Sequence, residues 1–347
     1  MPEALSTGPV ILDLNGLELE RAEHDLLLHP QCGGVILFAR NYESVEQVQH
    51  LTAAIRDCRP ELVIYVDQEG GRVQRMREGF LRLPPLAELG KLYAKDSAAA
   101  CQQAEQLGWL MAAECLSVGV DVSFAPVLDL DYANSQVIGD RALHSDPQIV
   151  GQLAEHYVQG MHQAGMAAVG KHYPGHGFVA ADSHVDIPVD HRDYEEIAAS
   201  DLLPFKHMIE KGVDGLMPAH VIYKQCDPDP AGFSVFWIQQ LLRMKLGFDG
   251  TVFSDDLTME GASCAGESMI ERARAALGAG CDVVLVCNNQ DAAQSTLDGL
   301  ERYTMSQDSL QRHQKMKARQ RQEWDVLHQS KQWNECVSSC QQHGVLA

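Results

Sequence analysis

The sequence of 347 residues is short of basic side chains and has no apolar run long enough to span a membrane. It carries 27 Lys and Arg against 48 Asp and Glu, a net charge of −21. Nucleic acids and anionic membrane surfaces attract clustered positive charge, so this balance argues against both as partners. A transmembrane helix needs roughly 20 consecutive apolar residues, and no segment approaches that length. We therefore expect a neutral or peptide-bearing small molecule as the partner.

Paired cysteine motifs and an export signal are also missing. The ten cysteines are scattered, with no C-x-x-C pair. At the amino terminus Glu3 precedes any basic residue, and the apolar run at 9–12 is too short for a signal peptide. Without an export signal, scattered cysteines are typical of reduced thiols. We expect a cytoplasmic protein with no metal and no cofactor.

Short apolar runs do recur along the chain, and long amphipathic stretches separate them. Runs rich in Val, Ile and Leu are typical of parallel strands that are buried on both faces. We predict eight such strands, at 10–14, 34–39, 62–67, 120–126, 167–172, 215–220, 251–255 and 281–287.

Helical patterns fill the intervals, at 44–58, 96–118, 147–164, 194–211 and 266–280. Ser44, Asp146 and Asp193 are good N-caps, and Gly165 and Gly280 stand where helices would end. Eight strand–helix units predict a (β/α)8 TIM-type barrel. The alternative, a doubly wound sheet, would need a G-x-G-x-x-G turn that is missing. We predict one domain, with the barrel at 1–300 and a peripheral extension of one or two helices at 301–347.

Polar residues gather where five of the predicted strands end. In a barrel the carboxyl ends of the strands meet at one face, where active sites form. These endings are Asp67–Arg72 with Arg75, Asn134 with Asp140-Arg141, Lys171–Gly177, Pro218–His220 and Ser254–Asp256. A single acid at a strand end is often a helix cap, and Asp256 keeps that interpretation. Asp255 leaves a buried strand directly, so we expect its carboxylate in the barrel mouth.

The tripeptide Asp182-Ser183-His184 follows the fifth strand. In an extended loop, residues two apart point the same way, so Asp182 is able to orient the His184 imidazole and raise its basicity. Serine hydrolases use this relation between an acid and a base. They also need an activated serine, and no G-x-S-x-G motif is present. The pair must therefore serve another reaction.

Together these blocks resemble the family 3 glycoside hydrolases, specifically the single-domain bacterial β-N-acetylglucosaminidases of peptidoglycan recycling. The resemblance runs from about residue 10 to 290. Its blocks, in the order of the family, are Asp67–Arg75, Val137–Arg141, Lys171–Gly177, Asp182–His184 and Phe253–Leu257. The K-H-x-P-G-H-G element followed by D-S-H is the most specific part.

The resemblance implies a retaining mechanism with a covalent glycosyl-enzyme. Asp255 would be the nucleophile, His184 the general acid/base and Asp182 its partner. The residues that would bind the sugar hydroxyls and the N-acetyl group are Asp67, Arg75, Arg141, Lys171 and His172. Histidine suits proton transfer because its pKa, roughly 6.5, lies near neutral pH.

The implied substrate is terminal, non-reducing β-linked GlcNAc on 1,6-anhydro-MurNAc, with or without peptide. The implied setting is cytoplasmic cell-wall recycling by a monomer that binds neither nucleic acid nor membranes. Within carbohydrate chemistry a phosphorylase or a β-glucosidase remains open, because a neutral histidine does not repel phosphate. Two other classes also remain. One is a metal-dependent barrel hydrolase with ligands among His172, His176, His184, His220 and Asp255. The other is a sugar-binding protein without activity.

Overall fold

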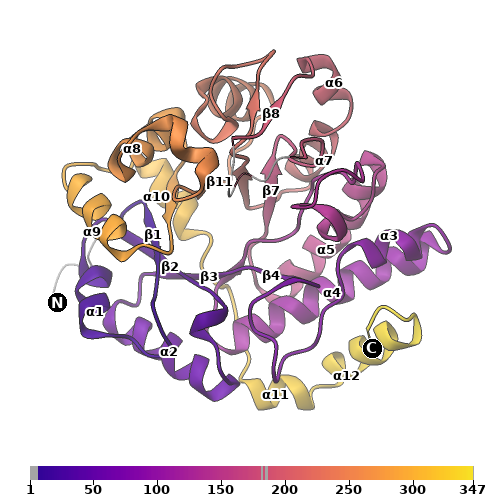
Figure 1. Cartoon of the computed structure of the whole chain (residues 1–347). Coiled ribbons are helices and arrows are strands. Elements are labelled where there is room, and N and C mark those ends of the chain that lie inside the picture. Colours follow the sequence, from indigo (N-terminus) through magenta and orange to yellow (C-terminus); the bar gives the residue numbers. More distant parts are fainter. Residues whose placement is uncertain (1–6, 181–182, 184–186, 347) are drawn as a thin grey trace.

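The computed structural model describes residues 7–180, 183 and 187–346, so Asp182 and His184 lie outside the described residues (Figure 1). Eight parallel strands form the central sheet, in the spatial order β6-β3-β2-β1-β12-β11-β9-β7. They are β1 (Val10–Asp13), β2 (Cys32–Leu37), β3 (Val63–Val66), β6 (Val122–Ser123), β7 (Val169–Tyr173), β9 (Gly215–Pro218), β11 (Thr251–Asp256) and β12 (Val283–Val286). Every one overlaps a predicted apolar run.

The two ends of this sheet meet, which makes it a barrel. Just beyond β6, Val127 bridges Lys171 of β7 in parallel. The Leu128 N–H donates to the Lys171 carbonyl at 2.7 Å, and the Val169 N–H donates to the Ala125 carbonyl at 2.9 Å. The predicted (β/α)8 barrel is therefore confirmed.

Helices cover the outside of the barrel, and their caps agree with the sequence. The helices are α1 (Arg21–Leu28), α2 (Val45–Cys58), α3 (Ala87–Tyr93), α4 (Ser97–Ser117), α5 (Pro147–Ala164), α6 (Tyr194–Ala199), α7 (Leu202–Glu210), α8 (Met269–Ala279), α9 (Gln290–Gly299) and a π-helix, Phe236–Lys245. Ser44, Asp146 and Asp193 accept backbone N–H groups of their helices. Gly165 and Gly280 end α5 and α8 with positive φ of 99° and 119°.

The prediction of one helix over 194–211 was wrong, because the chain breaks between α6 and α7. The break lies at Ser200, whose φ and ψ are −130° and −89°. Next to it, the buried Asp201 carboxylate accepts hydrogen bonds from Arg192 at 2.7 Å and from the Tyr132 hydroxyl at 2.8 Å. These partners lie outside the helix, so the break depends on tertiary contacts that helical periodicity does not contain.

Inside the barrel, aromatic side chains form a packed floor. The Tyr65 and Phe124 rings are stacked with centroids 5.0 Å apart, and the Phe253 ring meets both edge-on. Phe124, Met217 and Leu285 lie at the top of this floor, where they border a cavity. The carboxyl end of the barrel is therefore open above a closed core.

The C-terminal segment crosses the opposite, amino-terminal end of the barrel (Figure 1). His313 reaches the interior, where its Nε2 lies 2.9 Å from the Tyr65 hydroxyl. The segment has three short helices, α10 (Gln307–Gln314), α11 (Trp324–Gln329) and α12 (Lys331–Gln342), rather than the one or two predicted. Ser306 and Ser330 cap the first and last of them. The division of the chain at residue 300 stays a prediction.

Two small sheets stand above the barrel. Strands β4 (Gln68–Gly70) and β5 (Val73–Gln74) form an antiparallel hairpin, and β8 (Val189–Asp190) pairs in parallel with β10 (Ile222–Tyr223). In the part of the chain that the structure describes, no helix is both long and apolar enough to cross a membrane.

Candidate active site

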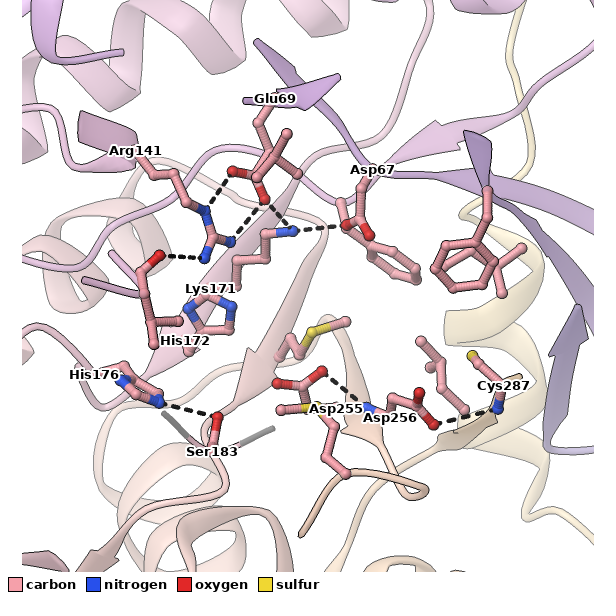
Figure 2. A pocket seen from close by; sticks show the side chains of 18 of the residues that line it. Asp67, Glu69, Arg141, Lys171, His172, His176, Ser183, Asp255, Asp256 and Cys287 are labelled. Atoms are coloured by element: carbon pink, nitrogen blue, oxygen red, sulfur yellow. Dashed lines mark hydrogen bonds and ion pairs between the residues drawn. The ribbon is translucent and has the colours of Figure 1, made fainter. Parts of the chain in front are cut away.

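A cavity of about 520 Å³ opens at the carboxyl end of the barrel, within the usual size of small-molecule sites. Most of the polar residues around it come from the ends of β3, β6, β7 and β11 and from the loops that follow these strands (Figure 2). They include Asp67, Glu69, Arg72, Arg75, Arg141, Lys171, His172, His176, Ser183, Asp255 and Asp256. Active sites of (β/α)8 barrels occupy this face.

A cluster of four charged side chains forms one wall, in which Lys171 and Glu69 are buried and Asp67 and Arg141 are half-buried. The Lys171 ammonium lies 2.8 Å from Asp67 Oδ1 and 2.6 Å from Glu69 Oε1. Arg141 donates two hydrogen bonds to the Glu69 carboxylate, at 2.8 and 2.9 Å. Arg75 adds a bond of 3.1 Å to Asp67. A buried lysine needs an acceptor, and these two carboxylates supply it.

The cluster keeps its carboxylates ionised. Burial alone would raise the pKa of Glu69, but the positive charges of Arg141 and Lys171 outweigh it and lower that pKa to about 2. Burial likewise opposes ionisation of Asp67, yet Lys171 and Arg75 hold its pKa below the usual range. Burial alone would lower the pKa of Lys171, but the charges of Asp67 and Glu69 outweigh it and raise that pKa. The wall therefore presents fixed donors and acceptors to the cavity, as recognition of sugar hydroxyls requires.

Beside this cluster, Asp129 orients the His172 ring and holds the His176 backbone. Its Oδ2 accepts a hydrogen bond from His172 Nδ1 at 2.7 Å, and its Oδ1 accepts the His176 backbone N–H at 2.7 Å. Burial raises the pKa of Asp129, but the charge of His172 reverses this and lowers it overall. An ionised Asp129 fixes the His172 ring with a proton on Nδ1.

Asp255 lies at the end of β11, on the far side of the cavity from Lys171 (Figure 2). Its Oδ1 accepts the backbone N–H of Asp256 at 2.8 Å. Asp256 has a structural role, because its carboxylate accepts hydrogen bonds from the backbone N–H of Thr258 at 3.0 Å and of Cys287 at 3.2 Å. Burial raises the pKa of Asp256 to about 6. It caps a turn and links β11 to β12, close to the cap interpretation from the sequence, but no helix starts there.

The structure brings six of the predicted site residues together around one cavity: Asp67, Arg75, Arg141, Lys171, His172 and Asp255. Their roles stay predictions. Ser183 lines the same cavity, whereas its neighbours Asp182 and His184 lie outside the described residues.

Sequence reasoning missed two residues, Glu69 and Asp129. Glu69 stood within the recognised Asp67–Arg75 block but was given no role. Asp129 lies between Leu128 and Leu130, and an acid in an apolar stretch is a signal, because a buried carboxylate needs a partner.

Three of the four histidines named as possible metal ligands are described, and each has a protein partner at one ring nitrogen. His172 Nδ1 is bound by Asp129, His176 Nε2 lies 3.1 Å from Ser183 Oγ, and His220 Nε2 lies 3.2 Å from the Asp256 carbonyl. Over residues 7–180, 183 and 187–346, no group of three or more His, Cys, Asp or Glu side chains is placed to hold a metal ion.

The chain matches a known protein family and curated relatives over most of its length. The family model "Glycosyl hydrolase family 3 N terminal domain" matches residues 9–320. A beta-hexosaminidase of Thioalkalivibrio sulfidiphilus (strain HL-EbGR7) is 52% identical over 330 residues, which cover 95% of this chain and 94% of the relative.

Solved structures agree. The crystal structure of native NagZ from Neisseria gonorrhoeae superposes with a TM-score of 0.92 at 44% identity, covering 99% of each chain. The structure of the Neisseria protein in complex with N-trifluoroacetyl-D-glucosamine has a TM-score of 0.91 at 43% identity, again over 99% of each chain.

Proposed function

The chain belongs to glycosyl hydrolase family 3 as a bacterial β-N-acetylglucosaminidase, and from that premise we propose a retaining exo-mechanism with Asp255 as the nucleophile. In this proposal His184 is the general acid/base and Asp182 orients it. One observation carries it: the Asp255 carboxylate stands across a single cavity from the ion cluster around Lys171 (Figure 2).

In this proposal the side of the cavity that carries the ion cluster binds the sugar, and the side that carries Asp255 performs the reaction. Asp67, Arg141 and Lys171 hold the hydroxyls and the N-acetyl group of a terminal sugar. Charge-assisted hydrogen bonds are the strong ones, and here the donors and acceptors are already fixed by each other. A sugar held against that wall turns its anomeric carbon toward Asp255. Arg75 and His172 border the same cavity and complete the binding set.

The reaction has two steps that balance in protons. In the first, Asp255 attacks the anomeric carbon while the His184 imidazolium gives its proton to the departing oxygen, which leaves a covalent glycosyl-enzyme. In the second, the now neutral His184 takes a proton from water, and the water oxygen displaces Asp255. The β-configuration is restored, and histidine replaces the second carboxyl group of most retaining glycosidases.

The proposed substrate is terminal β-linked GlcNAc on 1,6-anhydro-MurNAc, with or without peptide. A related Neisseria structure contains N-trifluoroacetyl-D-glucosamine, which supports an N-acylated glucosamine in the terminal-sugar position. The net charge of −21 supports a small carbohydrate partner rather than nucleic acid or an anionic membrane. We place the activity in cytoplasmic cell-wall recycling and the protein as a monomer.

The test is product analysis with aryl glycosides and the disaccharide. We expect hydrolysis of aryl N-acetyl-β-glucosaminide and of GlcNAc-anhydro-MurNAc, with β-GlcNAc as the first anomer seen by NMR. Initial release of the α-anomer would rule out retention. A GlcNAc 1-phosphate product in phosphate buffer would make the enzyme a phosphorylase, and equal rates on the aryl glucoside would make it a β-glucosidase.

A further inference from the structure

Asp129 is completely buried, at 0% exposure, and binds His172, which borders the cavity. Its Oδ1 accepts the backbone N–H of His176 at 2.7 Å and that of His172 at 3.2 Å. Its Oδ2 accepts a hydrogen bond from His172 Nδ1 at 2.7 Å and shares the His172 backbone N–H at 3.3 Å. One carboxylate oxygen therefore binds mainly the backbone, and the other binds mainly the ring.

The ionised state of Asp129 decides where the proton of the His172 ring lies. Burial opposes ionisation, but the charge of His172 outweighs it and lowers the pKa of Asp129. A carboxylate has no proton to donate, so the ring nitrogen that faces it must carry one. In a neutral imidazole, a proton on Nδ1 leaves a lone pair on Nε2, at the edge of the ring that is turned away from Asp129. Since His172 borders the cavity, this edge is the one that a ligand meets.

A lone pair on His172 complements the cations of the neighbouring cluster. Lys171 and Arg141 have only donors, and the carboxylates beside them are engaged: the Lys171 ammonium lies 2.6 Å from Glu69 Oε1. A sugar hydroxyl both donates and accepts, so it satisfies Nε2 and a cation of the cluster together. A fluorine or an ether oxygen at the same position has no proton to donate. A histidine in this state therefore distinguishes a free hydroxyl from a substituted one.

We propose that Asp129 is a positioning residue that keeps the proton of His172 on Nδ1, so that Nε2 accepts a hydrogen bond from a free hydroxyl of the terminal sugar. The inference rests on the proposed function, in which His172 belongs to the sugar-binding set. A further substituent on this hydroxyl leaves Nε2 without its donor, and an unsatisfied buried acceptor costs on the order of 10-fold or more in binding. The pair thereby contributes to the selection of a chain end, as an exo-mechanism requires.

Asp129→Asn changes the ring bond and keeps the backbone bonds. The amide oxygen takes the place of Oδ1 and still accepts the N–H groups of His176 and His172. The amide nitrogen takes the place of Oδ2 and donates to His172 Nδ1, which moves the ring proton to Nε2. At about pH 8, where ordinary histidines are neutral, 15N NMR should show an unprotonated Nε2 in the parent and a protonated Nε2 in the variant. The signals are assigned by their absence from His172→Phe, and a proton on Nε2 in the parent would overturn the proposal.

Kinetics test whether the lone pair recognises a hydroxyl. The measured quantity is kcat/KM for phenyl N-acetyl-β-glucosaminide and for its 3-, 4- and 6-deoxyfluoro analogues. At one of these positions, the ratio of kcat/KM between hydroxyl and fluorine should be at least about 10-fold larger in the parent than in Asp129→Asn. A protonated Nε2 no longer needs a donor, which is why the preference should shrink. The inductive effect of fluorine on the reaction is the same in every variant and cancels in this comparison.

Asp214→Asn is the matched control. Asp214 also joins a histidine to a backbone N–H, with His162 Nε2 at 2.6 Å and the Ala168 N–H at 2.9 Å, but it directly precedes β9 at the amino end of the barrel. Its hydroxyl-to-fluorine ratios should equal those of the parent, and melting curves check that each variant is folded. If Asp129→Asn does not fold, His172→Phe replaces it, because the loss of Nε2 should remove the same preference for a hydroxyl.

The outcomes separate this inference from the proposed function. If His172→Phe lowers one hydroxyl-to-fluorine ratio but folded Asp129→Asn keeps every parental ratio, His172 binds the sugar and positioning by Asp129 is wrong. If neither variant changes any ratio, the place of His172 in the sugar-binding set fails and takes the inference with it. Neither result touches Asp255, because its role as nucleophile is tested separately by trapping the covalent intermediate.

Discussion

Both ends of the barrel bury carboxylates beside cations, but the two ends use them differently. At the carboxyl end, Asp67 and Glu69 pair with Lys171 and Arg141 along a cavity of about 520 Å³. At the amino end, three aspartates each come directly before a strand and bind an arginine of the C-terminal segment. These pairs are Asp121 with Arg321, Asp214 with Arg319 and Asp282 with Arg312.

The hydrogen-bond partners of the carboxylates differ between the two ends of the barrel and indicate a different role for each end. Each lower aspartate also accepts a backbone N–H next to it in the barrel, from Ile64, Ala168 or Val252, at 2.8–2.9 Å. These bonds tie neighbouring strands to each other and to the C-terminal segment. The upper carboxylates bond side chains that face the cavity. We infer that charge at the upper end serves substrate binding and that charge at the lower end holds the strands.

Removing the nucleophile should have the largest effect. Asp255→Ala is expected to lower kcat/KM on aryl N-acetyl-β-glucosaminide by about 10⁴-fold or more, because the variant lacks the carboxylate that would form the covalent intermediate. Its melting temperature should stay close to that of the parent, since Asp255 is half-buried at the cavity. Steady-state kinetics with a melting curve check both statements, and residual activity within tenfold of the parent would remove Asp255 from the mechanism.

Breaking the ion cluster around Lys171 should lower activity less than the loss of Asp255 does, and it should also lower stability. Lys171→Met removes contacts to Asp67 and Glu69, and each charge-assisted bond is worth about 1.5–3 kcal/mol. We expect kcat/KM to fall by about 10²-fold, because substrate hydroxyls lose a donor and the two carboxylates repel each other. Unchanged kinetics in this variant would show that the cluster is only structural.

Breaking a lower pair should reverse that pattern. Asp282→Asn is expected to lower the free energy of unfolding by about 3–5 kcal/mol, because Arg243 and Arg312 lose a buried partner. Activity at 25 °C should remain within about twofold of the parent if the barrel stays folded. Asp249→Asn is the matched control: Asp249 is 86% exposed beside the same Arg312, so its loss should cost less than about 1 kcal/mol.

The smallest effect concerns acid sensitivity at the lower end. Burial lowers the pKa of His313 to about 4, so from pH 6.5 down to 4 the unfolded chain binds a proton that the folded chain does not. Stability contributed by neutral His313 is therefore present above pH 6.5 and lost as the pH falls toward 4. Denaturant unfolding of His313→Gln should show a shallower decline in this range. His176 is present in both the parent and the His313→Gln variant, so its contribution to the pH dependence of stability cancels in the comparison. Identical pH profiles of stability for the two proteins would contradict the prediction.

The sequence predicted the barrel well because the strands are read from local runs of apolar residues. All eight runs became strands, and caps such as Asp146 and Gly165 marked helix ends through bonds within a few residues. The active site was harder to predict from the sequence. Glu69 meets Arg141 across 72 positions and Asp129 meets His172 across 43, so their roles depend on pairings that only the closed barrel creates.

The same reason explains the other errors. The break at Ser200 lies beside Arg192 and the distant Tyr132. The C-terminal helices likewise have distant partners, since His328 Nε2 lies 3.0 Å from the Glu114 carboxylate. Lys171 and His172 were identified from sequence because they belong to a family motif. Such a motif marks residues that meet in the folded site, even when their partners are far away in the sequence.

The role of Asp255 as nucleophile is tested most directly by trapping the glycosyl-enzyme. The protein is incubated with a slow 5-fluoro derivative of a 2-acetamido-2-deoxy-glucoside, digested and mapped by mass spectrometry. We predict one sugar adduct on the peptide that contains Asp255, and none in Asp255→Ala. An adduct on any other side chain, or turnover of the reagent without any adduct, would contradict it.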